Sequence, residues 1–188
     1  MATTTKHEQT AKDLKASLDD IGDRFPVLSP DELFVMWFLR AYVTKSEARA
    51  AEAVSGGAQD KGGDAVFIDD AARSVFIVQG KYREQIAAKA EKRADVVSLA
   101  EIGQRVSESD NRLFQAFIEK TEGHVAEQLK LARRGVLKQG YRVWLYFATT
   151  GKVSEAPRKE AESLAKKASG EVTLDVIDGR RIIPMVRD

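Results

Sequence analysis

Three polar side chains on one predicted β-hairpin have types and a spacing that could do chemistry. Two short apolar runs, 65–68 and 74–78, flank a polar turn and predict the hairpin. Asp64 follows two glycines at the foot of the first strand, and Gln79 and Lys81 end the second strand with one residue between them. Because side chains alternate along a strand, Gln79 and Lys81 should point the same way. A bend of the hairpin that turns Asp64 toward them would bring a carboxylate, a carboxamide oxygen and an ammonium group together.

This set of groups suits a hard metal ion and an anionic substrate. Mg²⁺ prefers oxygen ligands and usually keeps several waters, so we expect Mg²⁺ or Mn²⁺ at Asp64 and Gln79. A lysine beside the metal can orient the attacking water or stabilise developing negative charge. The combination predicts hydrolysis of phosphodiester bonds, with Asp64, Gln79 and Lys81 as catalytic residues.

The order of two glycines, aspartate, hairpin and Gln-x-Lys resembles the Gln-x-Lys variant of the PD-(D/E)XK nuclease superfamily, known from Mrr-like restriction endonucleases. Residues 60–69 and 75–82 are most similar to the amino-terminal part of abortive-infection phage-resistance (AIPR) proteins, and the likeness covers residues 29–188. The resemblance implies a restriction-endonuclease-like fold, a magnesium-dependent endonuclease with DNA as its first expected substrate, and a role in antiphage defence. AIPR proteins are usually longer, so the chain could be the amino-terminal domain of a longer protein.

Two further contributors to the site follow from the resemblance. The backbone carbonyl of Gly80 would help to hold the metal. The first core helix of the superfamily commonly supplies an acidic residue, and Glu32 is the candidate on position, with Glu47 and Glu52 as reserves. An acid in the first turn of a helix is also explained by the helix dipole and by capping.

The glutamine leaves other functions open. The superfamily more often has Asp or Glu in place of Gln79, so a neutral carboxamide should lower the affinity for metal. The chain could therefore be a catalytically silent nucleic-acid-binding or regulatory module that keeps the nuclease fold, or, more remotely, a protein-interaction domain. Gln79 and Lys81 could also be a solvated strand end, but the continuous apolar run 75–78 favours a central, buried strand.

A group of basic residues on a later helix could bind phosphates. Lys130, Arg134 and Lys138 recur every fourth residue, with Arg133 alongside. On one helix they form a basic ridge, and phosphate contacts position a nucleic acid without reading its sequence. Basic side chains in a last helical turn also interact favourably with the helix dipole, so a structural explanation competes.

Composition bounds the class of protein. With 188 residues, 43% of them hydrophobic and 31% charged, the chain suits one globular domain, with a tail and docking helix at 1–28 and the nuclease-like domain at 29–188. A net charge of +1 means that a polyanion must meet a local basic patch. The absence of cysteine excludes disulfides and thiolate nucleophiles. No run has the length of a membrane span and no signal peptide is recognisable, so we expect a cytoplasmic protein, and a homodimer stays open.

The spacing of apolar residues, together with the positions of turn and capping residues, predicts an α/β fold. Apolar residues at helical spacing predict helices at 10–21, 30–53, much of 84–138, and from Ser154. Strands are expected at 141–150 and 172–177, and a strand, helix, strand order is a βαβ unit with parallel strands. The segment 85–93 could be an exposed helix or an ordered loop over the site. We therefore expect a mixed β-sheet flanked by helices, the layout of a restriction-endonuclease-like core.

Overall fold

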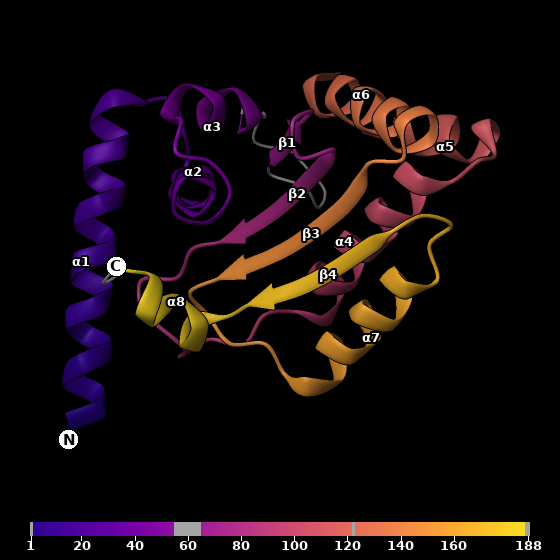
Figure 1. Ribbon diagram of the computed structural model, residues 1–188. Helices are drawn as coiled ribbons and strands as arrows, with labels where there is room; N and C mark the ends of the chain where they lie inside the picture. Colours follow the sequence, from indigo (N-terminus) through magenta and orange to yellow (C-terminus); the bar gives the residue numbers. More distant parts are fainter. Residues whose placement is uncertain (1, 55–64, 122, 187–188) are drawn as a thin grey trace.

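A four-stranded mixed β-sheet lies at the centre of the protein (Figure 1). The structure is a computed structural model that describes residues 2–54, 65–121 and 123–186. The strands lie side by side in chain order: β1 (Ala65–Asp69), β2 (Ser74–Lys81), β3 (Arg142–Thr149) and β4 (Val172–Ile177). β1 is antiparallel to β2, whereas β2, β3 and β4 are parallel. The predicted hairpin, the βαβ unit and the mixed sheet are thereby confirmed.

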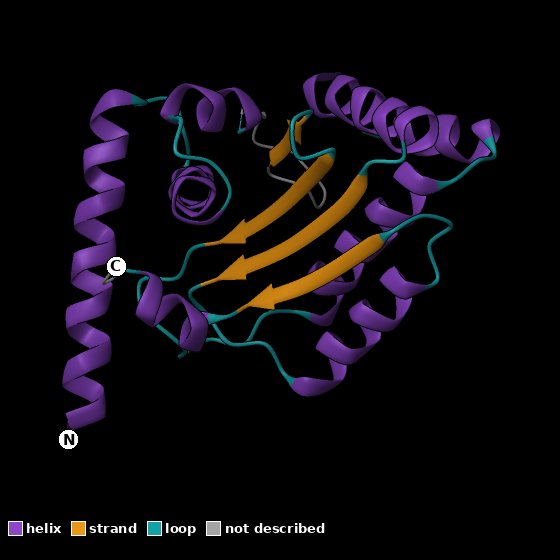
Figure 2. Cartoon of the chain, in the orientation of Figure 1, coloured by secondary structure: helices purple, strands orange, loops and turns teal. Residues whose placement is uncertain are grey.

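Helices cover both faces of the sheet (Figure 2). One face packs against α4 (Arg93–Ser107), α6 (Gly123–Gln139) and α7 (Glu155–Lys166), and α5 (Asn111–Ile118) extends that layer. The other face packs against α2 (Pro30–Tyr42) and α3 (Glu47–Ala53), with α1 (Ala2–Arg24) against α2, and α8 (Gly179–Met185) follows β4. Alternation of side chains along the strands sends successive residues to the two faces. The sheet therefore separates two apolar cores.

Two aspartates, Asp69 and Asp70, hold the hairpin turn. Asp69 accepts a hydrogen bond from the backbone N–H of Ala72 at 3.1 Å, and Asp70 accepts one from the Tyr141 hydroxyl at 2.9 Å. Arg73 closes the turn in the left-handed region, with φ of 50°. Asp69 and Asp70 are turn residues, at the opposite end of β2 from Lys81.

Two helices differ from the sequence prediction in their bounds. The helix predicted at 30–53 is divided, because Ser46 caps a new helix by accepting from the N–H of Arg49 at 3.3 Å. The first helix begins at Ala2 and not at residue 10, and it continues past Gly22 to Arg24. Leu14, Leu18 and Ile21 pack this helix into the core shared with α2, and exposed polar pairs four residues apart, such as Lys15 and Asp19, add to its stability.

The segment 84–138 contains three helices after a loop. Residues 84–92 are not helical, so of the two alternatives for 85–93 the loop is correct up to the start of α4. Asp110 caps α5 by accepting from the N–H of Arg112 at 2.8 Å. Within the described ranges, none of the helices combines the length and apolar character needed to cross a bilayer.

Candidate functional site

Gln79 lies at the carboxyl end of β2, a strand with a neighbour on each side. The residue is only 3% exposed, and its Oε1 has no hydrogen-bond partner among the residues that the structure describes. A buried carboxamide oxygen without a partner costs about 1–3 kcal/mol in lost hydration. An unpartnered polar atom at a strand end is therefore the first sign of a ligand site.

The side chains of Gln79 and Lys81 point to the same face of the sheet, as predicted. Gly80, between them, faces α2, where an added Cβ would overlap Cγ2 of Val35. Because side chains alternate, Gln79 and Lys81 point the other way, toward the core formed with α4, α6 and α7. Ile77, two residues earlier, is already part of that core.

The backbone at Lys81 is fixed by β3. The carbonyl oxygen of Lys81 accepts hydrogen bonds from the Thr149 hydroxyl at 3.0 Å and from the N–H of Thr150 at 3.2 Å. Successive carbonyls of a strand point to opposite sides, so the Gly80 carbonyl points away from β3 and toward the side of β1. The Gly80 carbonyl, which we expect to bind metal, therefore points toward the β1 side of β2.

Asp31 is an acidic residue at this strand end that the sequence analysis missed. It lies in the first turn of α2, and its Oδ1 accepts the N–H of Tyr82 at 2.7 Å. The Tyr82 N–H and the Gly80 carbonyl point to the same side of β2, because each shares a peptide group with a Lys81 group that is directed to β3, and the N–H and C=O of one peptide point in opposite directions. The Asp31 carboxylate consequently lies on the side toward which the Gly80 carbonyl points.

Glu32 makes the capping contact that explains an acid in the first turn of a helix without a catalytic role. The Glu32 carboxylate accepts the N–H of Ser29 at 2.6 Å, while the Ser29 hydroxyl accepts the N–H of Glu32 at 3.3 Å. This reciprocal pair is a capping box, which satisfies two donors at the start of α2. A catalytic role for Glu32 stays a prediction, and Asp31 is the acid of this turn that contacts the end of β2.

Asp64 lies outside the described residues, together with the glycine pair before it. The next residue in the chain, Ala65, has Val78 as its Cα partner across the hairpin. In the described part of the chain, no group of three acidic or histidine side chains could hold a metal ion. A metal site that includes Asp64 and Gln79 stays a prediction.

A buried ion pair stands beside Lys81. The Glu91 side chain is 1% exposed and receives two hydrogen bonds from Arg83, of 3.0 and 2.8 Å. Glu91 Oε1 is also 2.8 Å from the Thr149 hydroxyl, which contacts the Lys81 carbonyl. The hydrogen bond from Arg83 to Glu91 raises the pKa of the guanidinium. Glu91 thus links the loop after β2 to the end of β3. The charged residues around it in the chain gave no indication that Glu91 is buried.

The predicted basic ridge lies toward the other end of the sheet. The carbonyl of Gln139, at the end of α6, accepts a hydrogen bond from Arg73 in the hairpin turn. Seven residue steps along β2 separate this turn from Lys81, or about 23 Å at the rise of a strand. Lys138, one residue before Gln139, is therefore far from the candidate site.

Two members of the ridge are engaged in local contacts. Lys130 pairs with Glu127 at 2.7 Å. Arg133 donates to the Glu108 carbonyl at 2.9 Å and lies over the ring of Phe114 at 4.5 Å. Arg133 therefore joins α6 to the α4–α5 connection, and phosphate binding by the ridge stays a prediction.

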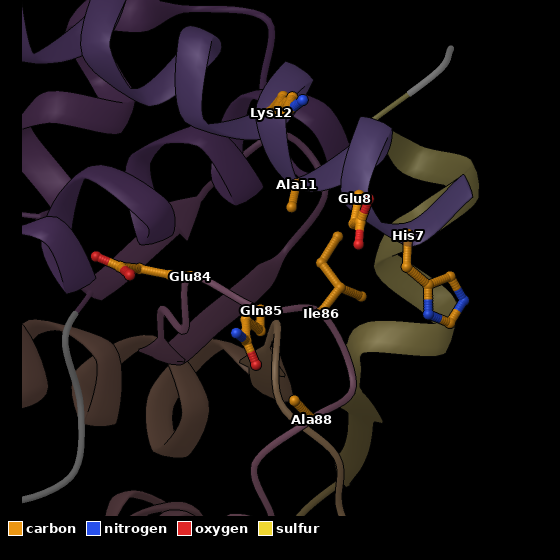
Figure 3. A pocket seen from close by; sticks show the side chains of 8 residues that line it. All are labelled: His7, Glu8, Ala11, Lys12, Glu84, Gln85, Ile86 and Ala88. Carbon is orange, nitrogen blue, oxygen red and sulfur yellow. The ribbon is translucent and has the colours of Figure 1, made fainter. Parts of the chain in front are cut away.

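A cavity of about 450 Å³ adjoins the loop after the candidate site (Figure 3). It lies between α1 and the loop, and its lining includes His7, Lys12, Glu84 and Ile86. In Figure 3 His7 and Glu84 lie at opposite ends of the group, and Ile86 points between them toward α1. The polar side chains do not converge on one point, so this cavity is a weaker candidate than the end of β2.

Comparisons of the chain with protein-family profiles, with curated proteins and with solved structures found no match.

Proposed function

We propose that the protein is a metal-dependent nuclease whose active site lies at the carboxyl end of β2. The observation that carries the proposal is the buried, unpartnered Oε1 of Gln79, two residues before a half-buried lysine on the same face of a central strand. A core oxygen without a partner is unfavourable for folding alone, and a bound cation would satisfy it.

The residues suit a hard cation in type. Asp64 and Gln79 would hold Mg²⁺ or Mn²⁺, with the Gly80 carbonyl, and Asp31 joins Glu32 as a candidate for the acidic group from the first core helix. All of these donors are oxygens, the ligands that Mg²⁺ prefers. When bound, the metal would neutralise charge on the phosphate and lower the pKa of a bound water.

Lys81 has the surroundings of a functional cation. It is half-buried, and it has no ion-pair partner among the described residues. Its backbone is held by two hydrogen bonds from β3, so the ammonium group starts from a fixed point. A fixed ammonium without a counter-ion can hold the attacking water or the negative charge of the pentacovalent phosphorane.

The finer assignments follow from this chemistry and from the sequence resemblance. We propose a restriction-endonuclease-like core, an AIPR-like nuclease domain acting on DNA, and a role in antiphage defence in the cytoplasm. The parallel β2, β3 and β4 with a hairpin at one edge are compatible with such a core.

A catalytically silent nucleic-acid-binding module is the second candidate. The neutral Gln79 favours it, as does the engagement of Glu32 in a capping box, since both lower the negative charge available to a metal. In that module Lys81 would bind a phosphate without hydrolysing it.

Cleavage assays separate the two candidates. Plasmid, single-stranded DNA and RNA are incubated with the wild type and Mg²⁺ or Mn²⁺, beside Lys81→Ala and Asp64→Ala. Lys166→Ala, which removes an exposed lysine in the last turn of α7, is the matched control. A nuclease loses cleavage in the first two variants and keeps it in the control, with circular dichroism unchanged. Absence of cleavage by the wild type on all three substrates would favour the silent module.

A further inference from the structure

Three exposed lysines lie close together in the connections that follow β2 and β3. The N–H of Lys152 donates to the Lys89 carbonyl at 2.8 Å, and the N–H of Glu91 donates to the Lys152 carbonyl at 3.0 Å. Ala90 and Lys152 form an isolated parallel bridge. Lys92 follows directly and occupies the N-cap position of α4. We call Lys89, Lys92 and Lys152 the lysine triad.

The triad is anchored to the candidate active site through its backbone. Thr149, three residues before Lys152, contacts both the Lys81 carbonyl and the buried carboxylate of Glu91. The N–H of Ala87 adds a hydrogen bond of 2.7 Å to the Thr150 carbonyl. The same short segments therefore hold Lys81 and the triad, so the lysines stand on a fixed frame.

The positive charges of the triad are not neutralised within the described part of the chain, where none of the three lysines has an ion pair or a side-chain hydrogen bond. The adjacent basic residues differ, because Arg93 pairs with Glu160 and Lys159 pairs with Glu155. Unpaired lysines repel one another and remain fully hydrated, so their grouping favours an anionic partner.

The start of α4 adds to this positive potential. Lys92 provides no side-chain acceptor at the N-cap, so the first N–H groups of the helix present partial positive charge toward solvent. Asp95 in the first turn offsets part of it. The lysines supply the larger contribution, and the helix terminus reinforces it.

We propose that the lysine triad binds the phosphate backbone of a nucleic acid strand and thereby places a phosphate at Lys81. The inference rests on the proposed nuclease site, because it names the surface by which that site holds its substrate. It competes with the basic ridge of α6, which lies toward the hairpin turn. Phosphate contacts by three lysines give affinity without sequence preference.

Binding without cleavage tests the inference. Fluorescence anisotropy of labelled duplex DNA, single-stranded DNA and RNA is measured in EDTA over a range of salt concentrations. One variant carries Lys89→Gln, Lys92→Gln and Lys152→Gln, and its rival carries Lys130→Gln, Arg134→Gln and Lys138→Gln. Both variants lose three positive charges, so net charge alone cannot separate them. Circular dichroism and thermal melting show whether each variant folds.

The triad variant should bind about tenfold or more weakly than the wild type at low salt, and the slope of log affinity against log salt should fall by about two to three units. The α6 variant should stay within about twofold. Equal losses in the two variants, a larger loss in the α6 variant, or no binding by the wild type would each overturn the inference. EDTA prevents metal-dependent cleavage, so this assay measures binding alone. If the protein binds through the triad but shows no cleavage in the assays with metal, the proposed nuclease activity is wrong and the proposed binding surface is still supported.

Discussion

The Oδ1 atom of Asp31 lies 2.7 Å from the backbone nitrogen of Tyr82, the residue that follows Lys81. This contact joins the first turn of α2 to the end of the central strand. It also distinguishes two neighbouring acids, because Glu32 turns back to Ser29 while Asp31 turns to the strand. Asp31 and Glu32 are therefore two candidates for the acidic group that α2 supplies to the proposed site, and they make different contacts.

Asp31→Asn should reduce cleavage more strongly than Glu32→Gln. The asparagine oxygen can still accept from Tyr82, so the fold should be kept while the negative charge is lost. We expect cleavage to fall by about a hundredfold or more in Asp31→Asn, and Glu32→Gln to cost about 1 kcal/mol or less of folding free energy through a weaker capping box. Single-turnover cleavage and urea unfolding measure both effects. If Glu32→Gln instead reduced cleavage more than Asp31→Asn, Glu32 would be the acidic residue of the site.

Gln79→Leu should stabilise the metal-free protein and abolish its activity. Leucine has a similar volume and removes the buried Oε1 that lacks a partner, so the free energy of unfolding in EDTA should rise by about 1–2 kcal/mol. Thermal melting with and without Mn²⁺ is the measurement, and the increase in melting temperature on adding Mn²⁺ should disappear in the variant. A variant less stable than the wild type in EDTA would mean that the oxygen has a structural partner.

Gly80→Ala should push α2 away from β2. The new Cβ would overlap Cγ2 of Val35, a residue that is fully buried. Overpacking of this kind costs about 1–3 kcal/mol, and cleavage should fall as well because α2 carries Asp31. Adding Val35→Ala makes room for the methyl group. The double variant should therefore lose less free energy of unfolding than the sum of the two single losses. Strict additivity would show that the contact relaxes without cost.

Glu91→Gln should loosen the loop that joins β2 to α4. Breaking a buried pair costs several kcal/mol, but Arg83 is 27% exposed and can be rehydrated, so we expect a loss of about 1–3 kcal/mol. Hydrogen exchange should increase at the N–H groups of Glu91 and Lys152, which bridge the loop and the end of β3. Unchanged exchange at these two amides would show that backbone hydrogen bonds alone hold the loop.

Tyr146 should make the protein sensitive to alkaline pH. Burial, followed by the nearby Tyr42, raises the pKa of Tyr146 to about 12 from 10.0. The folded state favours the neutral phenol. The contribution of Tyr146 to the free energy of unfolding is therefore fully present below pH 10 and is lost as the pH rises toward about 12. The loss should be on the order of 2 kcal/mol. Tyr146→Phe should flatten the free energy of unfolding over this range in urea titrations. An unchanged slope would assign the sensitivity to other tyrosines.

Local patterns predicted much of the fold. The apolar runs around the turn at 69–73 are short and rich in β-branched residues, so they predicted β1 and β2, and the near-clean alternation of 172–177 predicted β4. The break between α2 and α3 was missed, although residues 44–47 are all polar and Ser46 is a residue type that commonly caps a new helix. Helical propensity alone did not show that the first helix begins at Ala2.

The sequence by itself determined the order of elements, the common face of Gln79 and Lys81, and the chemistry that their types allow, since each follows from spacing along one strand. Only the tertiary structure decided which acid of the first turn of α2 meets the end of β2, because that contact joins segments about fifty residues apart. It also decided that Glu91 is buried and that Lys89, Lys92 and Lys152 gather, because these contacts join segments about sixty residues apart. Distances through space between such segments depend on how the sheet and helices pack, and no local pattern contains them.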